Sequence, residues 1–306
     1  MSLRALVVGA AAGGGLPQWN CNAPNSAAYW RSGGSAPSAS QSSLAVSGDG
    51  RDWALLNASP DIRAQIMARA ALQPRAGAGL RDTPIQAVLL TNADIDHIGG
   101  LLTLRERQAF DLFATEEVIR VLAANPIFDA LDPALVPRRT VALEAPVELV
   151  PGIRATLFPV PGKVPLFLEA KGADARIRTD LIGEQTVGVA LSDGAATVFY
   201  VPGCAAMTPE LAERLRGAAL VLFDGTLWTD DEMIAAGVGQ KTGRRMGHMP
   251  ISGPDGTIAA FAELGVRRKI FVHMNNTNPV WRDGPERAEA AAAGWEIAHD
   301  GMEVSL

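Results

Sequence analysis

The chain has 306 residues, of which 48% are hydrophobic, and a formal net charge of −6, so it can bury a large core. Its basic residues form only short clusters, whereas a nucleic-acid partner would need a concentrated basic surface. No apolar stretch approaches the roughly 20 residues that a membrane span needs. The two cysteines, Cys21 and Cys204, are too far apart in sequence to suggest a disulfide framework. These features predict a cytoplasmic protein that binds neither nucleic acid nor a membrane.

The first half of the chain is predicted to contain short strands and helices. A buried strand at residues 3–8 leads into a glycine-rich loop at 9–15, which lacks the Gly-Lys-Ser/Thr ending of a phosphate-binding loop. Gly48-Asp49-Gly50 indicates a hairpin turn, and Ser59-Pro60-Asp61 the start of a helix, because Ser59 can cap the free amides. The other elements predicted here are strands at 44–46, 53–57 and 85–91 and helices from 99 onward and at 115–124.

The second half begins with a β-rich stretch and ends in a predicted hairpin at 295–306 that turns at Asp300-Gly301. The predicted strands lie at 140–143, 147–150, 153–159, 186–191, 196–201, 219–223 and 269–273, and the predicted helices at 208–216, 256–264 and 285–293. Both halves place strands before helices without strict alternation, which suits helices packed on the outer faces of two mixed sheets. The sequence therefore predicts one α/β (α+β) domain over residues 1–306, a four-layer αββα sandwich.

The most informative segment is TNADIDHIGG at 91–100, which follows an apolar strand. Asp94, Asp96 and His97 can all bind a metal, and polar side chains on such a loop converge just beyond the strand's carboxyl end. The paired glycines let the backbone turn sharply. A polar turn with a helix cap is the alternative interpretation, since an Asp-His pair alone indicates little.

The positions of the other histidines strengthen the first interpretation. His273 ends the apolar strand KIFVH, and Asp224 ends VLFD. Three strand ends therefore present metal-binding side chains, which we expect at one edge of the predicted sheets. His248, in Gly-His-Met-Pro, is a further polar candidate, whereas His299 is typical of a surface or capping histidine.

Residues 91–100 resemble the signature of the metallo-β-lactamase superfamily, Thr/Ser-His-x-His-x-Asp-His-x-Gly-Gly. Asp96, His97 and both glycines match this signature, whereas Asn92 and Asp94 replace its first two histidines. The resemblance implies the metallo-β-lactamase fold, whose layers are those of the predicted sandwich.

The same resemblance assigns the distant candidates. Asp224 matches the carboxylate that bridges two metals in the superfamily, His273 matches its last histidine, and Lys163 stands where the remaining first-site histidine is expected. The first metal site thus loses its three imidazoles. The second keeps its full set of ligands, which are Asp96, His97, Asp224 and His273.

A longer resemblance covers nearly the whole chain. GGGLPQWNCN, TNADIDHIGGLLTLRE, VPGKVPLF, LFDGTLWTDDEM, MGHMPISGPDG and HMNNTNP are together similar to the PqqB family of coenzyme PQQ (pyrroloquinoline quinone) biosynthesis proteins. That family usually carries a Cys-x-Cys-x-x-Cys structural zinc site, and here those positions are Cys21, Ala23 and Ser26. Because one cysteine cannot hold a tetrahedral zinc ion, we predict that this structural zinc is absent.

The resemblance implies an enzyme with one divalent metal ion. The ligand set is close to that of non-haem Fe(II) oxygenases, and zinc, manganese or copper could also occupy it in vitro. The implied activity is Fe(II)- and O2-dependent hydroxylation of the tyrosine-derived ring of a cross-linked Glu–Tyr precursor of PQQ. A carrier of PQQ or its precursor is the alternative. Metal-dependent hydrolysis is disfavoured because a two-metal mechanism needs both ions.

The remaining candidates surround the predicted ion. Asp94, Lys163 and His248 are the candidate catalytic residues, and the candidate substrate-binding residues are Asn92, Asn275 and Asn276. Each has an alternative: Asp94 and Asn92 could support the ligands or bind the metal weakly, Lys163 could be a solvated loop lysine, and His248 could be structural. The asparagines after His273 could form Asx turns. The expected partner is PQQ or a small-molecule precursor, and the sequence leaves open whether the chain forms a homodimer.

Overall fold

Strands of the computed structural model, which describes residues 2–169, 178–179 and 181–305, form two seven-stranded sheets. The order is β14-β1-β2-β3-β4-β5-β6 in the first sheet and β13-β12-β11-β10-β9-β8-β7 in the second. The strands of the first sheet are β1 (Arg4–Gly9), β2 (Ser43–Ser47), β3 (Trp53–Leu56), β4 (Ile85–Leu89), β5 (Asp111–Ala114), β6 (Arg138–Thr140) and β14 (Glu303–Ser305). Those of the second are β7 (Pro146–Val150), β8 (Ile153–Pro159), β9 (Val187–Ser192), β10 (Thr197–Val201), β11 (Leu220–Asp224), β12 (Arg268–Val272) and β13 (Trp295–Ile297).

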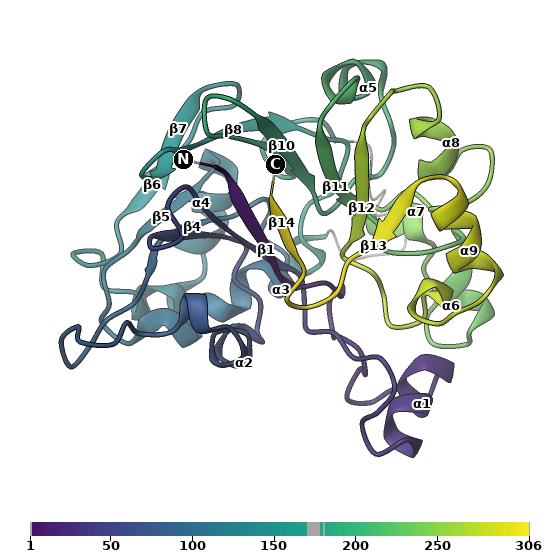
Figure 1. The fold of residues 1–306 in the computed structure, drawn as a ribbon, viewed down its shortest axis with the longest axis horizontal. Coiled ribbons are helices and arrows are strands. Elements are labelled where there is room, and N and C mark those ends of the chain that lie inside the picture. Colours follow the sequence, from purple (N-terminus) through teal and green to yellow (C-terminus); the bar gives the residue numbers. More distant parts are fainter. Residues whose placement is uncertain (1, 170–177, 180, 306) are drawn as a thin grey trace.

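Helices cover the outer faces of the two sheets (Figure 1). The α-helices are α1 (Pro24–Arg31), α2 (Ile62–Ala68), α3 (Ile95–Ile98), α4 (Glu116–Ala123), α5 (Pro209–Leu215), α6 (Glu232–Ala235), α7 (Gly243–Met246), α8 (Thr257–Phe261) and α9 (Pro285–Ala292). The 3-10 helices are η1 (Ala70–Leu72), η2 (Gly99–Arg105), η3 (Pro126–Ala130), η4 (Leu166–Leu168) and η5 (Pro279–Trp281). No helix among the described residues is long and apolar enough to cross a membrane.

Alternation along the strands divides the core into layers. In β1, Ala5 and Val7 belong to the core between the sheets, whereas Leu6 and Val8 pack outward in a second core with residues of α2, α3 and α4. Helices α5, α8 and α9 contribute to the core on the side of the second sheet. Because both faces of the sheets are buried, most strands are apolar throughout rather than alternating. These layers confirm the predicted αββα sandwich.

Each sheet combines antiparallel and parallel pairs. Strands β3 to β6 are mutually parallel in the first sheet, and β10 to β13 are parallel in the second. In each sheet, the carboxyl ends of the parallel neighbours meet at one edge. This edge carries the polar loop after β4 in the first sheet and the polar loops after β11 and β12 in the second.

The predicted terminal hairpin at 295–306 is wrong. Strand β13 pairs with β12 in the second sheet, whereas β14 pairs with β1 in the first, so the segment crosses from one sheet to the other. The Asp300 carboxylate accepts hydrogen bonds from the backbone N–H groups of Ala10 and Ser40, which fixes this crossing. Each strand gains more by extending an existing sheet edge than a short isolated ribbon would offer.

Other boundaries also differ from the predictions. Strand β6 lies at Arg138–Thr140 instead of 140–143, and β5 and α1 were not predicted. The helix expected from 99 onward is the 3-10 helix η2, which follows the short helix α3. Helix α2 begins at Ile62, and the Ser59 hydroxyl accepts a hydrogen bond from the Asp61 N–H in the preceding turn. The predicted turn at Gly48-Asp49-Gly50 is confirmed, since it joins the antiparallel strands β2 and β3.

Candidate metal centre

The candidate centre forms where the loops after β4, β11 and β12 meet between the two sheets. The Val187 N–H donates to the Thr91 carbonyl and so ties the loop after β4 to the second sheet. The Met274 N–H donates to the carbonyl of Ala10, which brings the glycine-rich loop alongside His273. The Asn275 N–H donates to the Thr226 carbonyl and so joins the loops after β11 and β12.

Gly100 brings the end of α3 against the segment that follows β3. The Gly100 N–H donates to the Ala58 carbonyl, and the Ala58 N–H donates to the His97 carbonyl. A Cβ atom at Gly100 would overlap the backbone carbonyl of Ser59. This position therefore requires glycine because two backbones approach closely, and the contact fixes His97 at the end of the helix.

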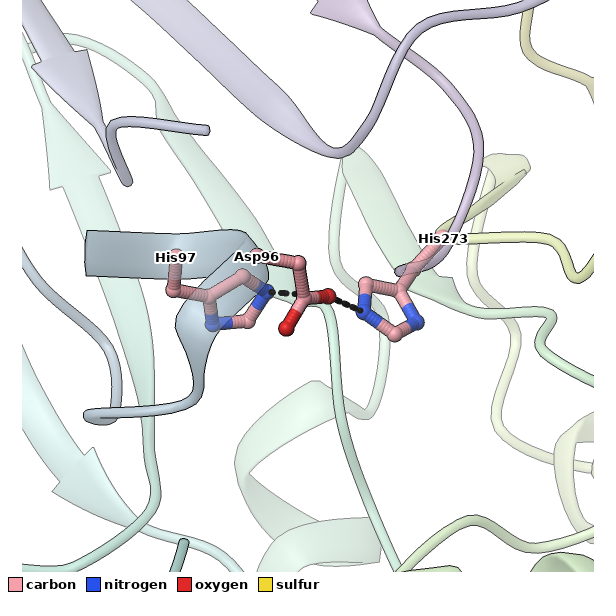
Figure 2. Close-up of side chains that lie close together, drawn as sticks. All are labelled: Asp96, His97 and His273. Carbon is pink, nitrogen blue, oxygen red and sulfur yellow. Dashed lines mark hydrogen bonds and ion pairs between the residues drawn. The ribbon is translucent and has the colours of Figure 1, made fainter. Parts of the chain in front are cut away.

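Asp96, His97 and His273 form a first group of side chains that could bind a metal. Figure 2 shows the Asp96 carboxylate between the two imidazoles. Asp96 Oδ2 lies 3.0 Å from His273 Nε2 and 3.9 Å from His97 Nε2. His97 is buried, and its Nε2 atom has no hydrogen-bond partner among the described residues. Because this free nitrogen faces the Asp96 carboxylate beside His273, it is suited to bind a metal ion.

The other ring nitrogen of His97 is held by neighbouring side chains. Nδ1 lies 2.7 Å from Asn92 Oδ1 and 3.4 Å from the Thr91 hydroxyl. Because an amide oxygen can only accept, Nδ1 carries the proton and Nε2 presents its lone pair towards Asp96. Burial lowers the pKa of His97 to about 4, so the ring is neutral at ordinary pH. Metal-binding histidines are commonly oriented in this way, and these residues fit a divalent ion.

His273 has a backbone conformation that few non-glycine residues adopt, with φ at 59°. Its Nδ1 atom lies 2.9 Å from the Thr226 hydroxyl, while Nε2 faces Asp96. Burial disfavours the charged ring, but the hydrogen bond to Asp96 and the charges of Asp96 and Asp224 outweigh it and raise the pKa of His273. The pocket therefore favours a positive charge, which a bound metal would also supply.

Asp224, His248 and His273 form a second group beside the first. Asp224 is fully buried, and both of its oxygens accept two hydrogen bonds. Oδ2 accepts from the Cys204 N–H and lies 2.7 Å from His248 Nδ1, while Oδ1 accepts from the N–H and the hydroxyl of Thr226. The structure thus brings Asp224 to His273 but not into the group of Asp96 and His97. Direct ligation by Asp224 stays a prediction.

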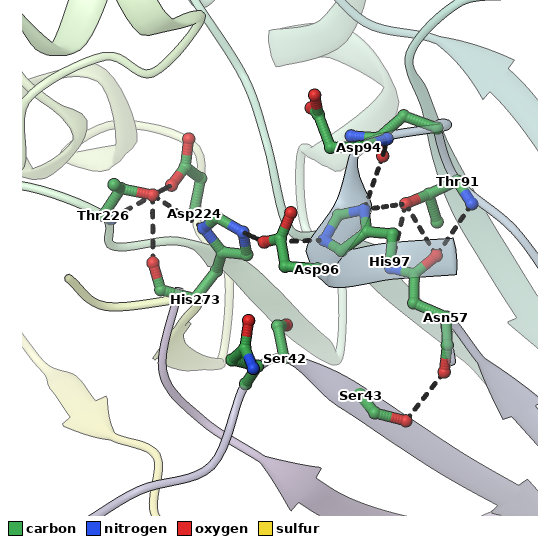
Figure 3. Close-up of polar contacts among 12 residues, drawn as sticks. Ser42, Ser43, Asn57, Thr91, Asp94, Asp96, His97, Asp224, Thr226 and His273 are labelled. Atoms are coloured by element: carbon green, nitrogen blue, oxygen red, sulfur yellow. Dashed lines mark hydrogen bonds and ion pairs between the residues drawn. The ribbon is translucent and has the colours of Figure 1, made fainter. Parts of the chain in front are cut away.

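Thr226 is a residue that the sequence analysis missed. Its hydroxyl lies 2.6 Å from Asp224 Oδ1, 2.9 Å from His273 Nδ1 and 3.0 Å from His248 Nδ1. Figure 3 shows Thr226 beside Asp224 and His273, on the opposite side of Asp96 from His97. Its position two residues after Asp224, in a strand-end turn, was the available signal. Thr226 orients the ring of His273.

A cavity of about 360 Å³ opens onto both groups. Its lining includes the candidates Asn92, Asp94, Asp96, Lys163, His248, His273 and Asn275. Lys163 Nζ lies 3.4 Å from Asp94 Oδ1, and the Lys163 side chain is 10% exposed, so it is not a solvated loop lysine. Asn92 uses its side-chain oxygen for the Asp94 N–H and for His97.

Three candidates lie outside this cavity lining, namely His97, Asp224 and Asn276. Asn276 is buried, and its amide donates to the Ser26 hydroxyl, so the structure does not bring it to the cavity. Asp224 lies behind His248 and Thr226 and is also absent from the lining.

His299 is exposed, as expected for a surface histidine. Cys21 is buried, and its sulfur accepts from the Ala23 N–H. The loss of the structural zinc stays a prediction.

Two seven-stranded sheets between helical layers, with Asp and His side chains at the strand ends, define a metallo-β-lactamase fold with a candidate metal centre. Residues 52–274 match the model of the beta-lactamase superfamily domain. The chain is 58% identical over 305 residues to coenzyme PQQ synthesis protein B of Ruegeria pomeroyi, covering 99% of this chain and 100% of that protein. It is 55% identical over 307 residues to the protein of the same name from Xanthomonas oryzae, with the same coverage. The chain belongs to the coenzyme PQQ synthesis protein B family of this superfamily.

Solved structures agree with this assignment. The crystal structure of Zn²⁺-bound PqqB from Methylobacterium extorquens is similar, with a TM-score of 0.95 and 49% identity, over 99% of this chain and 100% of that one. A diphosphatase of the PhnP family has a TM-score of 0.69 at 19% identity, over 100% of this chain and 98% of that one, and so shares the fold alone.

Proposed function

We propose that this chain acts in PQQ biosynthesis as an Fe(II)- and O2-dependent hydroxylase of the tyrosine-derived ring of a cross-linked Glu–Tyr precursor. The observation that supports this most is the group of Asp96, His97 and His273, in which His97 Nε2 lacks a partner. Two imidazoles and one carboxylate are the ligands that non-haem Fe(II) oxygenases use. Family membership supports the place in PQQ biosynthesis.

The surroundings of this group favour one ion over two. Asn92 and Asp94 stand where the superfamily signature has histidines, and the Lys163 ammonium group lies against Asp94. A lysine cation in this place repels a second metal ion. Hydrolysis by two metals, which clamps the attacking and leaving oxygens together, is therefore not the activity that we propose.

The proposed reaction replaces a ring C–H bond with C–OH. One atom of O2 enters the ring and the other leaves as water, and an external two-electron reductant such as ascorbate supplies two electrons with two protons. The bound ion supplies the site at which O2 is activated. Lys163 and Lys241, which both line the cavity, attract the substrate carboxylates. His248, whose Nδ1 is held by Asp224, offers its other nitrogen to the phenol proton.

The test is anaerobic loading with Fe(II), followed by O2, ascorbate and the cross-linked Glu–Tyr substrate. We expect a product that gains one oxygen atom from labelled O2, detected by mass spectrometry, and no product from a His97→Ala variant. Absence of product with every divalent metal would refute the hydroxylase. Tight binding of PQQ that survives metal removal would then favour the carrier function.

A further inference from the structure

A chain of three polar side chains leads away from the cavity beside the candidate metal centre. Asn275 lines the cavity, and its Nδ2 atom donates to the Thr277 hydroxyl at 2.6 Å. That hydroxyl donates in turn to Glu232 Oε1. Glu232 is the first residue of α6, and its neighbour Met233 lines the same cavity. None of the steps proposed above uses Glu232 or Thr277.

The direction of these hydrogen bonds is fixed at the Glu232 end. Oε2 accepts a hydrogen bond from the Trp228 backbone N–H at 2.6 Å, and a backbone N–H can only donate. With Glu232 ionised, Oε1 can only accept, so the Thr277 proton points to Glu232. The Thr277 oxygen must then accept from the Asn275 amide. The direction of each hydrogen bond in this chain therefore follows from which atoms can donate and which can only accept.

This order decides which atom Asn275 offers to the cavity. Because Nδ2 is used by Thr277, the side-chain oxygen Oδ1 is left, and it has no partner among the described residues. The Asn275 backbone is also fixed, since its N–H donates to the Thr226 carbonyl and its carbonyl accepts from the Trp281 ring N–H. The Asn275 side chain can therefore present Nδ2 to the cavity instead of Oδ1 only if its amide group flips.

We infer that Glu232 and Thr277 are positioning residues that hold the Asn275 amide with its oxygen towards the cavity, where it accepts a hydrogen bond from an ammonium group of the ligand. Lys163 and Lys241 line the same cavity and suit carboxylates. The ligand class is therefore a small amino acid with its amino group at Asn275. This inference rests on the proposed function, because it names how that substrate is oriented.

The environment of Glu232 is compatible with this arrangement. Burial raises the pKa of Glu232 to about 7, although the hydrogen bonds from Thr277 and Trp228 oppose the shift. Above this pH the Glu232 carboxylate is ionised, and the hydrogen bonds from Asn275 to Thr277 and from Thr277 to Glu232 keep these directions. In a Glu232→Gln variant, the side-chain oxygen accepts from Trp228 and the amide nitrogen donates to Thr277. The Thr277 proton then points to Asn275 and favours the opposite amide orientation.

The test compares L-tyrosine with its desamino analogue, which lacks only the amino group. Their affinities for the zinc-loaded protein are measured by titration calorimetry at a pH well above the pKa of Glu232. We expect the wild type to prefer L-tyrosine by about tenfold, the value of one charge-assisted hydrogen bond after its desolvation. Thr277→Val and Glu232→Gln should abolish this preference, while Thr277→Ser, which keeps the hydroxyl, should retain it.

Three results would overturn the inference: a wild type that binds the probes equally or binds neither, a Thr277→Val variant that keeps the preference, or a Thr277→Ser variant that loses it. Equal weakening of both probes would show a structural role only and would also overturn it. Thermal melting of each variant confirms folding. Binding needs no turnover, so this result is independent of whether hydroxylated product forms.

Discussion

The two sides of the candidate metal centre differ in how completely their polar atoms are hydrogen-bonded. On the Asp96 side, the buried Nε2 atom of His97 has no partner among the described residues. On the Asp224 side, both carboxylate oxygens accept two hydrogen bonds, and Thr226 contacts three of the neighbouring polar groups. His273 lies between the sides and takes part in both groups.

This difference indicates which side binds the ion and which side supports it. Leaving a buried polar atom unpaired costs about 1–3 kcal/mol, and a metal ion bound between Asp96, His97 and His273 would remove this cost at His97. The positive φ of His273 is a second local cost at the same place. The saturated Asp224 side holds His248 and His273 in fixed orientations, as supporting groups around metal ligands commonly do.

Removal of the unpaired His97 nitrogen should give the largest loss of zinc affinity. We expect His97→Ala to lower zinc affinity by more than about a hundredfold, beyond the range for groups that only support ligands. The measurement is competition for zinc against a chromophoric chelator. His299→Ala, which changes an exposed histidine, is the matched control. Wild-type affinity in His97→Ala would place the ion elsewhere.

Asp224→Asn tests the opposite side of the comparison. Because Asp224 is saturated with hydrogen bonds, we expect zinc affinity to fall by about 10–100-fold, the range for supporting groups, and less than in Asp96→Asn. The exposed Asp231→Asn serves as the control. If Asp224→Asn costs as much affinity as Asp96→Asn, Asp224 is a direct ligand, as the sequence predicts.

Substitutions of Asn92 should have a smaller effect on zinc affinity, and they test how His97 is oriented. Its side-chain oxygen fixes the protonated nitrogen of His97, so Asn92→Ala should lower zinc affinity by about tenfold. Asn92→Asp keeps an accepting oxygen and should retain most of the affinity. The same chelator competition measures both. Equal losses in the two variants would contradict an orienting role for Asn92.

Glu232 connects to the supporting side through Thr277 and Asn275, and it should have the smallest effect on metal binding. Its pKa is raised from 4.5 to about 7 by burial. Between these values the folded protein holds a proton that the unfolded chain has released, so stability falls as pH rises through this interval. We expect this fall to be on the order of 3 kcal/mol and to disappear in Glu232→Gln. Urea unfolding of metal-free protein at several pH values measures this fall in stability. Identical pH profiles for the wild type and Glu232→Gln would contradict the prediction.

The sequence predicted the fold class and the main candidates for the site because both depend on local patterns. Apolar runs that end in polar residues marked β4, β11 and β12, and these strand ends carry His97, Asp224 and His273. Strands were missed where the pattern is weak. Strand β5 has four residues, and one of them is an aspartate. The terminal segment reads as a hairpin because its two strands are adjacent in sequence, although they extend different sheets.

The sequence by itself determined which side chains could bind a metal, since only Asp, His and similar residues have suitable atoms. The tertiary structure decided which of those atoms are free. Asp224 is saturated because a backbone N–H from Cys204 and the side chain of His248 reach it, and both are about twenty residues away. His97 keeps a free nitrogen because Asn92 takes the other one. Hydrogen-bond partners are assigned by packing between distant segments, and no local sequence pattern records that assignment.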